Sequence, residues 1–161
     1  MMNDDRLDNG SLADLYGRPG FLIRRAHQIT SALFAEEVDD LAITSTQFGM
    51  LIALQGGVSL DQASLARLLG LDRSTTGLVV ANLEERGFIK RKTDPQDRRR
   101  RVLTMTPAGE AIRAQAEIAS RRAQARALEV FEGRDGAEFV QLLGHFVDAF
   151  NASTRAPIGE T

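Results

Sequence analysis

The chain has 161 residues, of which 43% are hydrophobic and 26% are charged. This composition is typical of one compact globular domain with room for oligomerisation helices, and it argues against fibrous and disordered proteins. The absence of cysteine excludes disulfide scaffolds, cysteine-ligated metal sites and thiol redox chemistry. The first ten residues are polar and acidic, and no long apolar run follows, so we expect a cytoplasmic protein without a membrane partner.

The formal net charge of −2 conceals an uneven distribution. Residues 86–101 contain 8 Lys or Arg and 2 Asp or Glu, a net charge of +6, so the other 145 residues have a net charge of −8. A concentrated basic segment is the electrostatic footprint of a surface that neutralises phosphates. The charge pattern therefore indicates a nucleic acid as partner.

The N-terminal part of the chain predicts an arm and two helices. Residues 1–17 are polar and lack periodicity, which predicts a flexible arm. Apolar residues then recur at helical spacing and predict a first helix within residues 18–42. Thr44 and Gln47 match a capping box, so a short second helix follows, and it ends before Gly56.

A helix-turn-helix followed by a hairpin is predicted for the middle of the chain. Asp61 and Asp72 are each placed to cap a helix, and a turn of about three residues joins the two helices. Short β-prone runs within about residues 88–105 flank the segment 94–97, whose Asp-Pro start suits a type I turn. Residues 43–106 are thus predicted to form a winged helix-turn-helix region.

Two long helices are predicted for residues 107–152, followed by a tail over 153–161. Thr106 and Pro107 suit the N-cap and first position of the first long helix. The second carries an apolar stripe at helical spacing, made of Phe139, Leu142, Leu143, Phe146, Val147 and Phe150. The preceding helix has few large apolar residues to cover it, so we expect the stripe and the first helix to bury against a second subunit. The predicted fold class is mainly α with a small β wing, a winged helix-turn-helix with N- and C-terminal dimerisation helices.

Several short motifs accompany these elements in a fixed order. They are Leu71-Asp72-Arg73-Ser74-Thr75, Leu83-Glu84-Glu85-Arg86-Gly87-Phe88-Ile89, Asp94-Pro95-Gln96-Asp97-Arg98-Arg99 and Thr106-Pro107-Ala108-Gly109. Together with the order of elements, they resemble the MarR family of winged-helix transcriptional regulators over roughly residues 20–152. The segment Pro19-Gly20-Phe21-Leu22-Ile23-Arg24-Arg25 is further similar to a branch that controls aromatic-acid catabolism.

The resemblance implies binding to double-stranded DNA. The helix over about 73–86 would read the major groove with its first turn, and the wing arginines would enter a minor groove. The residues expected at this interface are Arg73, Ser74, Thr75, Thr76, Asp97, Arg98 and Arg99. The resemblance also implies that Asp97 orients Arg99. Two alternatives stay open: Thr75 or Thr76 packs inward behind the cap, or the arginine run is only a solvated charged surface.

Gly77 and Leu78 depart from the family pattern, which leads us to expect a polar residue followed by a basic one. Gly77 lacks a side chain and allows a close approach to DNA. Leu78 either contacts a thymine methyl group or covers the core. The departure leaves room for a different function, that of a dimeric protein-interaction module with a degenerate helix-turn-helix.

A polar stripe on the first helix predicts an effector site between that helix and the winged region. The residues expected to bind the effector are Arg24, His27, Gln28, Ser31 and Phe34. A guanidinium pairs bidentately with a carboxylate, and the resemblance implies this role for Arg24. Alternatively, Arg24 extends to solvent or pairs with an acid such as the partner subunit's Glu36 or the partner subunit's Glu37. The expected effector is a small aromatic carboxylate or its CoA thioester.

The expected function is that of a homodimeric repressor of an aromatic-compound catabolic operon. It would bind a pseudo-palindromic operator and be released by its effector, the mode that the resemblance implies. An enzyme is not expected, because the chain has only two histidines, His27 and His145, and no glycine-rich phosphate loop. The same lack of clustered ligands argues against a metal or cofactor.

Overall fold

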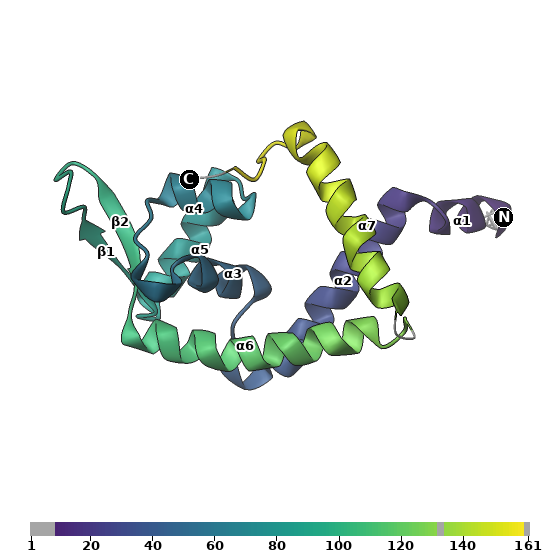
Figure 1. The fold of residues 1–161 in the computed structure, drawn as a ribbon, viewed down its shortest axis with the longest axis horizontal. Helices are drawn as coiled ribbons and strands as arrows, with labels where there is room; N and C mark the ends of the chain where they lie inside the picture. The colour runs from purple at the N-terminus through teal and green to yellow at the C-terminus, as the bar shows by residue number, and fades with distance from the viewer. Residues whose placement is uncertain (1–8, 132–133, 160–161) are drawn as a thin grey trace, which may run out of the picture.

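The structure of the protein is a computed structural model that describes residues 9–131 and 134–159 (Figure 1). The elements that precede the two strands are α1 (Asn9–Tyr16), α2 (Pro19–Glu37), η1 (Asp39–Leu41), α3 (Ser45–Ala53), η2 (Gln55–Gly57), α4 (Gln62–Leu69) and α5 (Arg73–Glu85). They are followed by β1 (Ile89–Thr93), β2 (Arg101–Met105), α6 (Pro107–Leu128), α7 (Arg134–Phe150) and η3 (Asn151–Ser153). The predicted fold class, mainly α with a small β wing, is confirmed.

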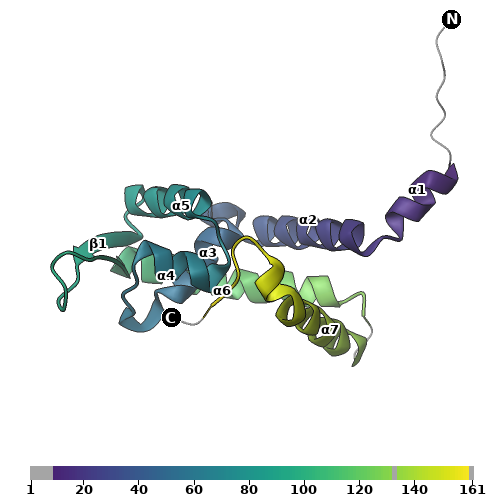
Figure 2. The ribbon, with the colours of Figure 1, turned by 90° about the horizontal axis from the view of Figure 1, so that it is seen from above.

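The N-terminal segment differs from the prediction. Residues 9–16 form α1, so the expectation of an arm over 1–17 is wrong there, and residues 1–8 lie outside the described residues. Leu12, Leu15 and Tyr16 share one face of this helix, a short apolar pattern that the polar composition conceals. The Tyr16 ring lies 5.2 Å from that of Phe21, which joins α1 to α2. Figure 2 shows α1 projecting away from the rest of the molecule.

Four capping side chains start the helices α3, α4 and α5 of the winged region and the helix α6 that follows it. Thr44, Asp61, Asp72 and Thr106 each accept a hydrogen bond from the backbone N–H three residues later. Gly70 ends α4 with a φ of 61°, the left-handed conformation that glycine adopts without steric cost. The sequence signals for these boundaries are therefore confirmed.

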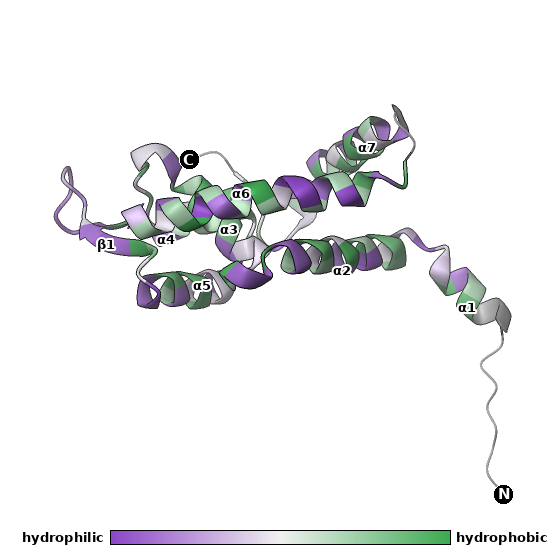
Figure 3. Ribbon diagram, turned by 90° about the horizontal axis from the view of Figure 1, so that it is seen from below, coloured by the Kyte–Doolittle hydropathy of each residue, from purple (hydrophilic) through white to green (hydrophobic). Residues whose placement is uncertain are grey.

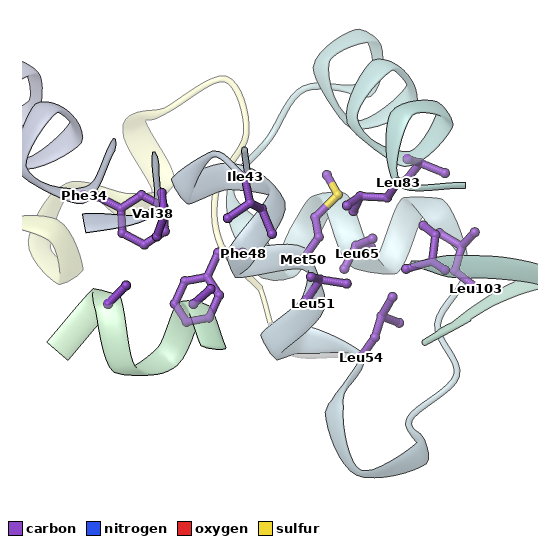
Figure 4. Packing of buried hydrophobic residues seen from close by; sticks show 14 of the residues in the cluster. Phe34, Val38, Ile43, Phe48, Met50, Leu51, Leu54, Leu65, Leu83 and Leu103 are labelled. Atoms are coloured by element: carbon purple, nitrogen blue, oxygen red, sulfur yellow. The ribbon is translucent and has the colours of Figure 1, made fainter. Parts of the chain in front are cut away.

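The hydrophobic core extends from α2 and α6 through α3, α4 and α5 to the wing (Figure 4). Met50, Leu51, Leu65 and Leu83 are completely buried there. Burial of each such side chain stabilises the fold by about 2 kcal/mol. This core fixes α5 relative to α4 and so determines which face of α5 is exposed to solvent.

The wing is an antiparallel hairpin of β1 and β2, in which Ile89 lies opposite Met105 and Thr93 opposite Arg101. An isolated bridge joins Leu60, just before α4, to Leu103 of β2. Ile89 and Leu103 are buried, whereas the rest of β1 is exposed. The base of the wing is thus part of the core, and its tip projects from it (Figure 1).

The long helix α6 connects the winged region to the other end of the molecule. Its 22 residues span about 33 Å. Buried Ala119 and Ala123 let α2 pack against α6, and Arg126 pairs with Glu36 and Glu37 of α2, at 2.8 Å in each case. The helix α7 then turns back, and the chain end returns to α4 (Figure 1).

The C-terminal tail packs against the helix-turn-helix. The side-chain amide of Asn151 donates to the carbonyl of Ile158 and accepts from its N–H. The N–H of Gly159 donates to the carbonyl of Arg67 at the end of α4. The tail therefore joins the end of α7 to the turn that precedes α5.

The helix α7 exposes its apolar stripe. Its large hydrophobic residues from Phe139 to Phe150 are 38–60% exposed, and Leu22, Ile23 and Ile29 of α2 are also exposed. Figure 3 shows hydrophobic residues along both helices. His145 is exposed as well, so it is not a core residue of this chain. In the described part of the chain, no helix combines the length and apolar character that crossing a membrane requires.

Candidate nucleic-acid interface and ligand cavity

The first turn of α5 is the first part of the candidate interface. Arg73 and Ser74 are exposed there, directly after the N-cap Asp72. The carboxylate of Asp72 accepts from the backbone N–H of Thr75 at 2.9 Å and from its hydroxyl at 2.7 Å. These hydrogen bonds lower the pKa of Asp72, so it remains ionised as a cap. The cap leaves the guanidinium of Arg73 at the positive end of the helix, where it is placed to meet an anionic backbone.

Thr76 is not at this surface. Its side chain is 0% exposed, and its hydroxyl donates to the carbonyl of Asp72 at 2.8 Å. Val80 and Leu83, one and two turns later, are buried on the same side of α5. The expectation that Thr76 contacts DNA is therefore wrong in this structure, because the helical period turns it into the core.

The tip of the wing exposes Arg98 and Arg99. Within residues 9–131 and 134–159, neither guanidinium forms an ion pair. Asp97 accepts a hydrogen bond from the backbone N–H of Arg99 at 2.9 Å, and its carbonyl accepts from Arg100. Asp97 thus shapes the backbone of the loop, and through it the direction in which Arg99 leaves the wing.

Two other basic residues of the wing bind to the helix-turn-helix, which sequence reasoning missed. Arg100 pairs with Asp61, the N-cap of α4. Arg91 pairs with Glu84 of α5 at 2.8 Å and donates to Gln62 of α4 at 3.3 Å. The wing is therefore attached to both helices, and these arginines are not available to neutralise phosphates while the pairs are formed.

Among the residues of these ion pairs, Asp61 shows the largest change in pKa. The N–H of Ser64 and the guanidinium of Arg100 both stabilise its carboxylate, and together they lower its pKa to about 2, against burial, which raises it. The same contact raises the pKa of Arg100. The sequence indicates that Asp61 caps α4, but it does not indicate the pair with Arg100, since these two residues are 39 residues apart.

Leu78 resolves one of the open alternatives. It is 73% exposed on α5, so the interpretation that it covers the core is wrong. A Cβ added to the neighbouring Gly77 would lie 3.4 Å from the side-chain nitrogen of Gln62. Gly77 therefore faces α4, whereas Leu78 projects into solvent.

A cavity of about 300 Å³ lies between α2, α3 and α6. Three of the residues expected to bind an effector line it, namely His27, Ser31 and Phe34. Phe34 stacks on Phe48 at 5.7 Å between ring centres, and the buried Ser120 lies on the α6 side. This volume is at the lower end of the range that small organic ligands occupy.

Arg24 and Gln28 are not among the residues that line this cavity. The guanidinium of Arg24 lies 4.9 Å from the ring centre of Phe21 and donates to Gln28 at 3.2 Å. The structure therefore separates the expected set into three residues at the cavity and two on the exposed part of α2.

Comparisons with known proteins agree with this architecture. A model of the MarR family matches residues 43–100. Over 104 residues, the chain is 39% identical to a protein of Thauera aromatica named for a proposed role in transcriptional regulation of the hcr operon, covering 64% of this chain and 61% of that protein. It is 32% identical over 99 residues to the transcriptional repressor NicR of Pseudomonas putida, covering 62% of this chain and 63% of NicR. The matches thus span less than two thirds of these two relatives.

Solved structures match over more of the chain. PcaV of Streptomyces coelicolor, solved with its natural ligand, has a TM-score of 0.73 at 32% identity, covering 84% of this chain and 96% of PcaV. BpsR of Bordetella bronchiseptica has a TM-score of 0.76 at 26% identity, covering 83% and 95%. CouR bound to a 23-mer DNA duplex has a TM-score of 0.74 at 27% identity, covering 86% and 96%. The chain therefore belongs to the MarR family, a family of transcriptional regulators and not of enzymes.

Proposed function

We propose that the protein is a homodimeric DNA-binding repressor of an aromatic-compound catabolic operon, acting in the cytoplasm. The observation that carries this proposal is the exposed first turn of α5 with Arg73 and Ser74, beside a wing whose tip exposes Arg98 and Arg99. A capped helix end and a cationic hairpin are the shapes that enter a major and a minor groove. The relative CouR, solved on a DNA duplex, supports the same partner.

The exposed apolar faces support the dimer. The stripe of α7 and the exposed apolar residues of α2 together form more apolar surface than the scattered single residues normal on a monomer. Both helices lie away from the strand β1 of the wing (Figure 3). A symmetric pair presents two recognition helices, which favours a pseudo-palindromic operator with half-sites about 34 Å apart.

The cavity supports a small aromatic carboxylate, or its CoA thioester, as effector. Stacked Phe34 and Phe48 provide an aromatic wall, and His27 and Ser31 provide polar contacts. Arg24 lies one turn before His27 on α2, which allows its long side chain to approach a carboxylate from outside the cavity. BpsR, whose DNA binding is regulated by 6-hydroxynicotinic acid, supports this ligand class. The ligand would favour a dimer geometry that no longer matches successive major grooves.

The DNA-binding proposal is tested by fluorescence anisotropy on the duplex upstream of the protein's own gene, measured across salt concentrations. We expect tight binding that weakens steeply with salt, and a slope that falls by about 1 per subunit in Arg99→Ala. Arg121→Ala, which removes an exposed arginine of α6 that pairs with Glu117, is the matched control and should leave the slope unchanged. Absence of salt-sensitive binding would favour the protein-interaction module.

The effector proposal is tested by adding a pool of aromatic carboxylates to the same complex. We expect the pool to release the wild-type protein. Arg24→Ala should bind DNA normally and resist release, whereas Arg25→Ala, its neighbour on α2, serves as the control. Normal release of Arg24→Ala would remove Arg24 from the site, and a wild-type complex that the pool leaves intact would exclude this effector class.

A further inference from the structure

The outward face of α5 carries small and polar residues around one large apolar side chain. Ser74, Ala81 and Glu85 are exposed on this face, and Leu78 projects between Ser74 and Ala81. Gly77 is half-buried on the side of α5 that faces α4. The opposite side of the helix is buried in the core. Leu78 is therefore the largest side chain near the middle of the face that α5 turns to its surroundings.

Leu78 is also isolated from the other exposed apolar surface. At 73% exposure it exceeds Val58 and Ile52, the other exposed large hydrophobic residues of the winged region. Those two lie in the segments around η2 and not on α5. Figure 2 shows α5 and α7 on opposite sides of the molecule, so Leu78 does not extend the apolar stripe of α7. A single leucine among small and polar residues is too small an area for a protein-docking patch.

The major groove offers one matching group to such a side chain. Among the base-pair edges exposed there, the C5 methyl of thymine is the apolar one, whereas the other groups are hydrogen-bond donors and acceptors. An alkyl side chain gains by covering the methyl and loses when it covers an unpaired polar edge. The small exposed neighbours Ser74 and Ala81 leave room for α5 to approach the base edges.

We infer that Leu78 reads the methyl group of a thymine in each half-site of the operator and thereby determines specificity at that base pair. This inference rests on the proposed DNA-binding function and adds to it an apolar contact for one position of the site. Arg73 and the wing arginines supply charge and donors, which phosphates and polar base edges accept. Leu78 supplies the apolar contact that distinguishes thymine by its methyl group, which those charged and polar groups cannot do.

The test removes the methyl group from DNA. A duplex is first selected by the wild-type protein from a randomised library, and each thymine is then replaced by uracil, symmetrically in both half-sites. We expect one thymine position at which uracil weakens wild-type binding by about fourfold per half-site, the effect of losing one buried methyl. Leu78→Ala should bind the thymine and uracil duplexes equally at that position and keep its response to uracil elsewhere.

Val58→Ala, an exposed apolar residue outside α5, is the matched control and should retain the wild-type response to uracil. Circular dichroism of Leu78→Ala should match the wild type, since a residue exposed to this degree adds little to the core. The inference is overturned when wild type and Leu78→Ala respond alike to every uracil duplex. A library from which the wild type selects no duplex would instead overturn the proposed function itself.

Discussion

The two ends of the molecule differ in how they bury their apolar residues. In the winged region, Met50, Leu65 and Leu83 are completely buried by elements of the same chain. On α7, the large apolar residues remain between 38% and 60% exposed. One end thus forms a closed core from a single chain, whereas the other presents an apolar surface that a single chain leaves open.

This difference shows that the same sequence signal has two structural outcomes. Helices α3 to α5 are short and cross one another, so each covers the apolar face of the next. The helix α7 follows a long, alanine-rich α6 and turns back without lying along it (Figure 1). Amphipathic periodicity predicts that a face is buried, but the geometry of the neighbouring elements decides whether its own chain can bury it.

The largest expected effect is on the free energy of unfolding. It comes from comparing two glycine-to-alanine substitutions, one where α6 packs against the closed core and one on the open helix α7. A Cβ at Gly109 would lie 2.0 Å from the carbonyl oxygen of Phe88, where α6 packs against the chain entering β1. Gly109→Ala must therefore shift backbone and should lower the free energy of unfolding by about 3 kcal/mol or more. A urea titration followed by circular dichroism measures the loss.

Gly144→Ala on α7 is the matched control, because nothing lies within 4 Å of the added Cβ. Alanine has the higher helix propensity, so the substitution should be neutral or stabilise α7 by up to about 1 kcal/mol. Equal destabilisation by the two changes would contradict the distinction between a closed and an open end.

The second prediction concerns the open surface of α7. Phe146→Asp places a charge in the apolar stripe, which in the proposed dimer is repeated in both subunits by symmetry. We expect the dissociation constant of the dimer to rise by about 100-fold or more, with the helix content of the winged region retained. Analytical ultracentrifugation over a concentration series measures this.

Leu78→Asp is the control, because it places the same charge on an exposed apolar residue outside α7. Leu78 is also an exposed apolar residue, but it lies on α5 in the winged region. The dimer should therefore be unaffected by this change. If both variants dissociate to the same extent, or if neither does, α7 is not the dimerisation surface.

Much of the winged region was predictable because its signals are local. A cap and the N–H that it binds are three residues apart, as at Asp61 and Asp72, so both appear in one window of sequence. The same holds for Gly70, whose left-handed turn ends α4. Element order and boundaries follow from such signals.

The rest of the site depends on contacts between residues far apart in the chain. Arg91 and Arg100 look like the other arginines of the basic run, and only the folded hairpin brings them to Glu84 and Asp61. The burial of Thr76 likewise depends on which side of α5 meets the core. The sequence therefore locates the interface to a segment, and the tertiary structure separates the arginines that hold the wing from those at its tip.

The smallest effect is expected at the ion pair that joins wing and helix-turn-helix. Asp61→Asn keeps a residue that caps α4 but removes the charge that binds Arg100, whereas Asp61→Ala removes both. We expect losses of about 1 kcal/mol for Asn and about 2 kcal/mol for Ala near pH 7, measured by urea unfolding. The larger loss in Asp61→Ala than in Asp61→Asn separates capping of α4 from attachment of the wing.

The stability that the Asp61 carboxylate contributes should depend on pH. The pKa of Asp61 is lowered from its ordinary value of 3.8 to about 2 in the folded protein. A lowered pKa means that the carboxylate contributes its full stability above pH 4 and loses it as the pH falls towards 2. The difference between wild type and Asp61→Asn should therefore be constant from pH 7 to pH 5 and shrink between about pH 4 and pH 2. A difference that persists unchanged at pH 2 would show that the ionised carboxylate of Asp61 does not attach the wing to α4.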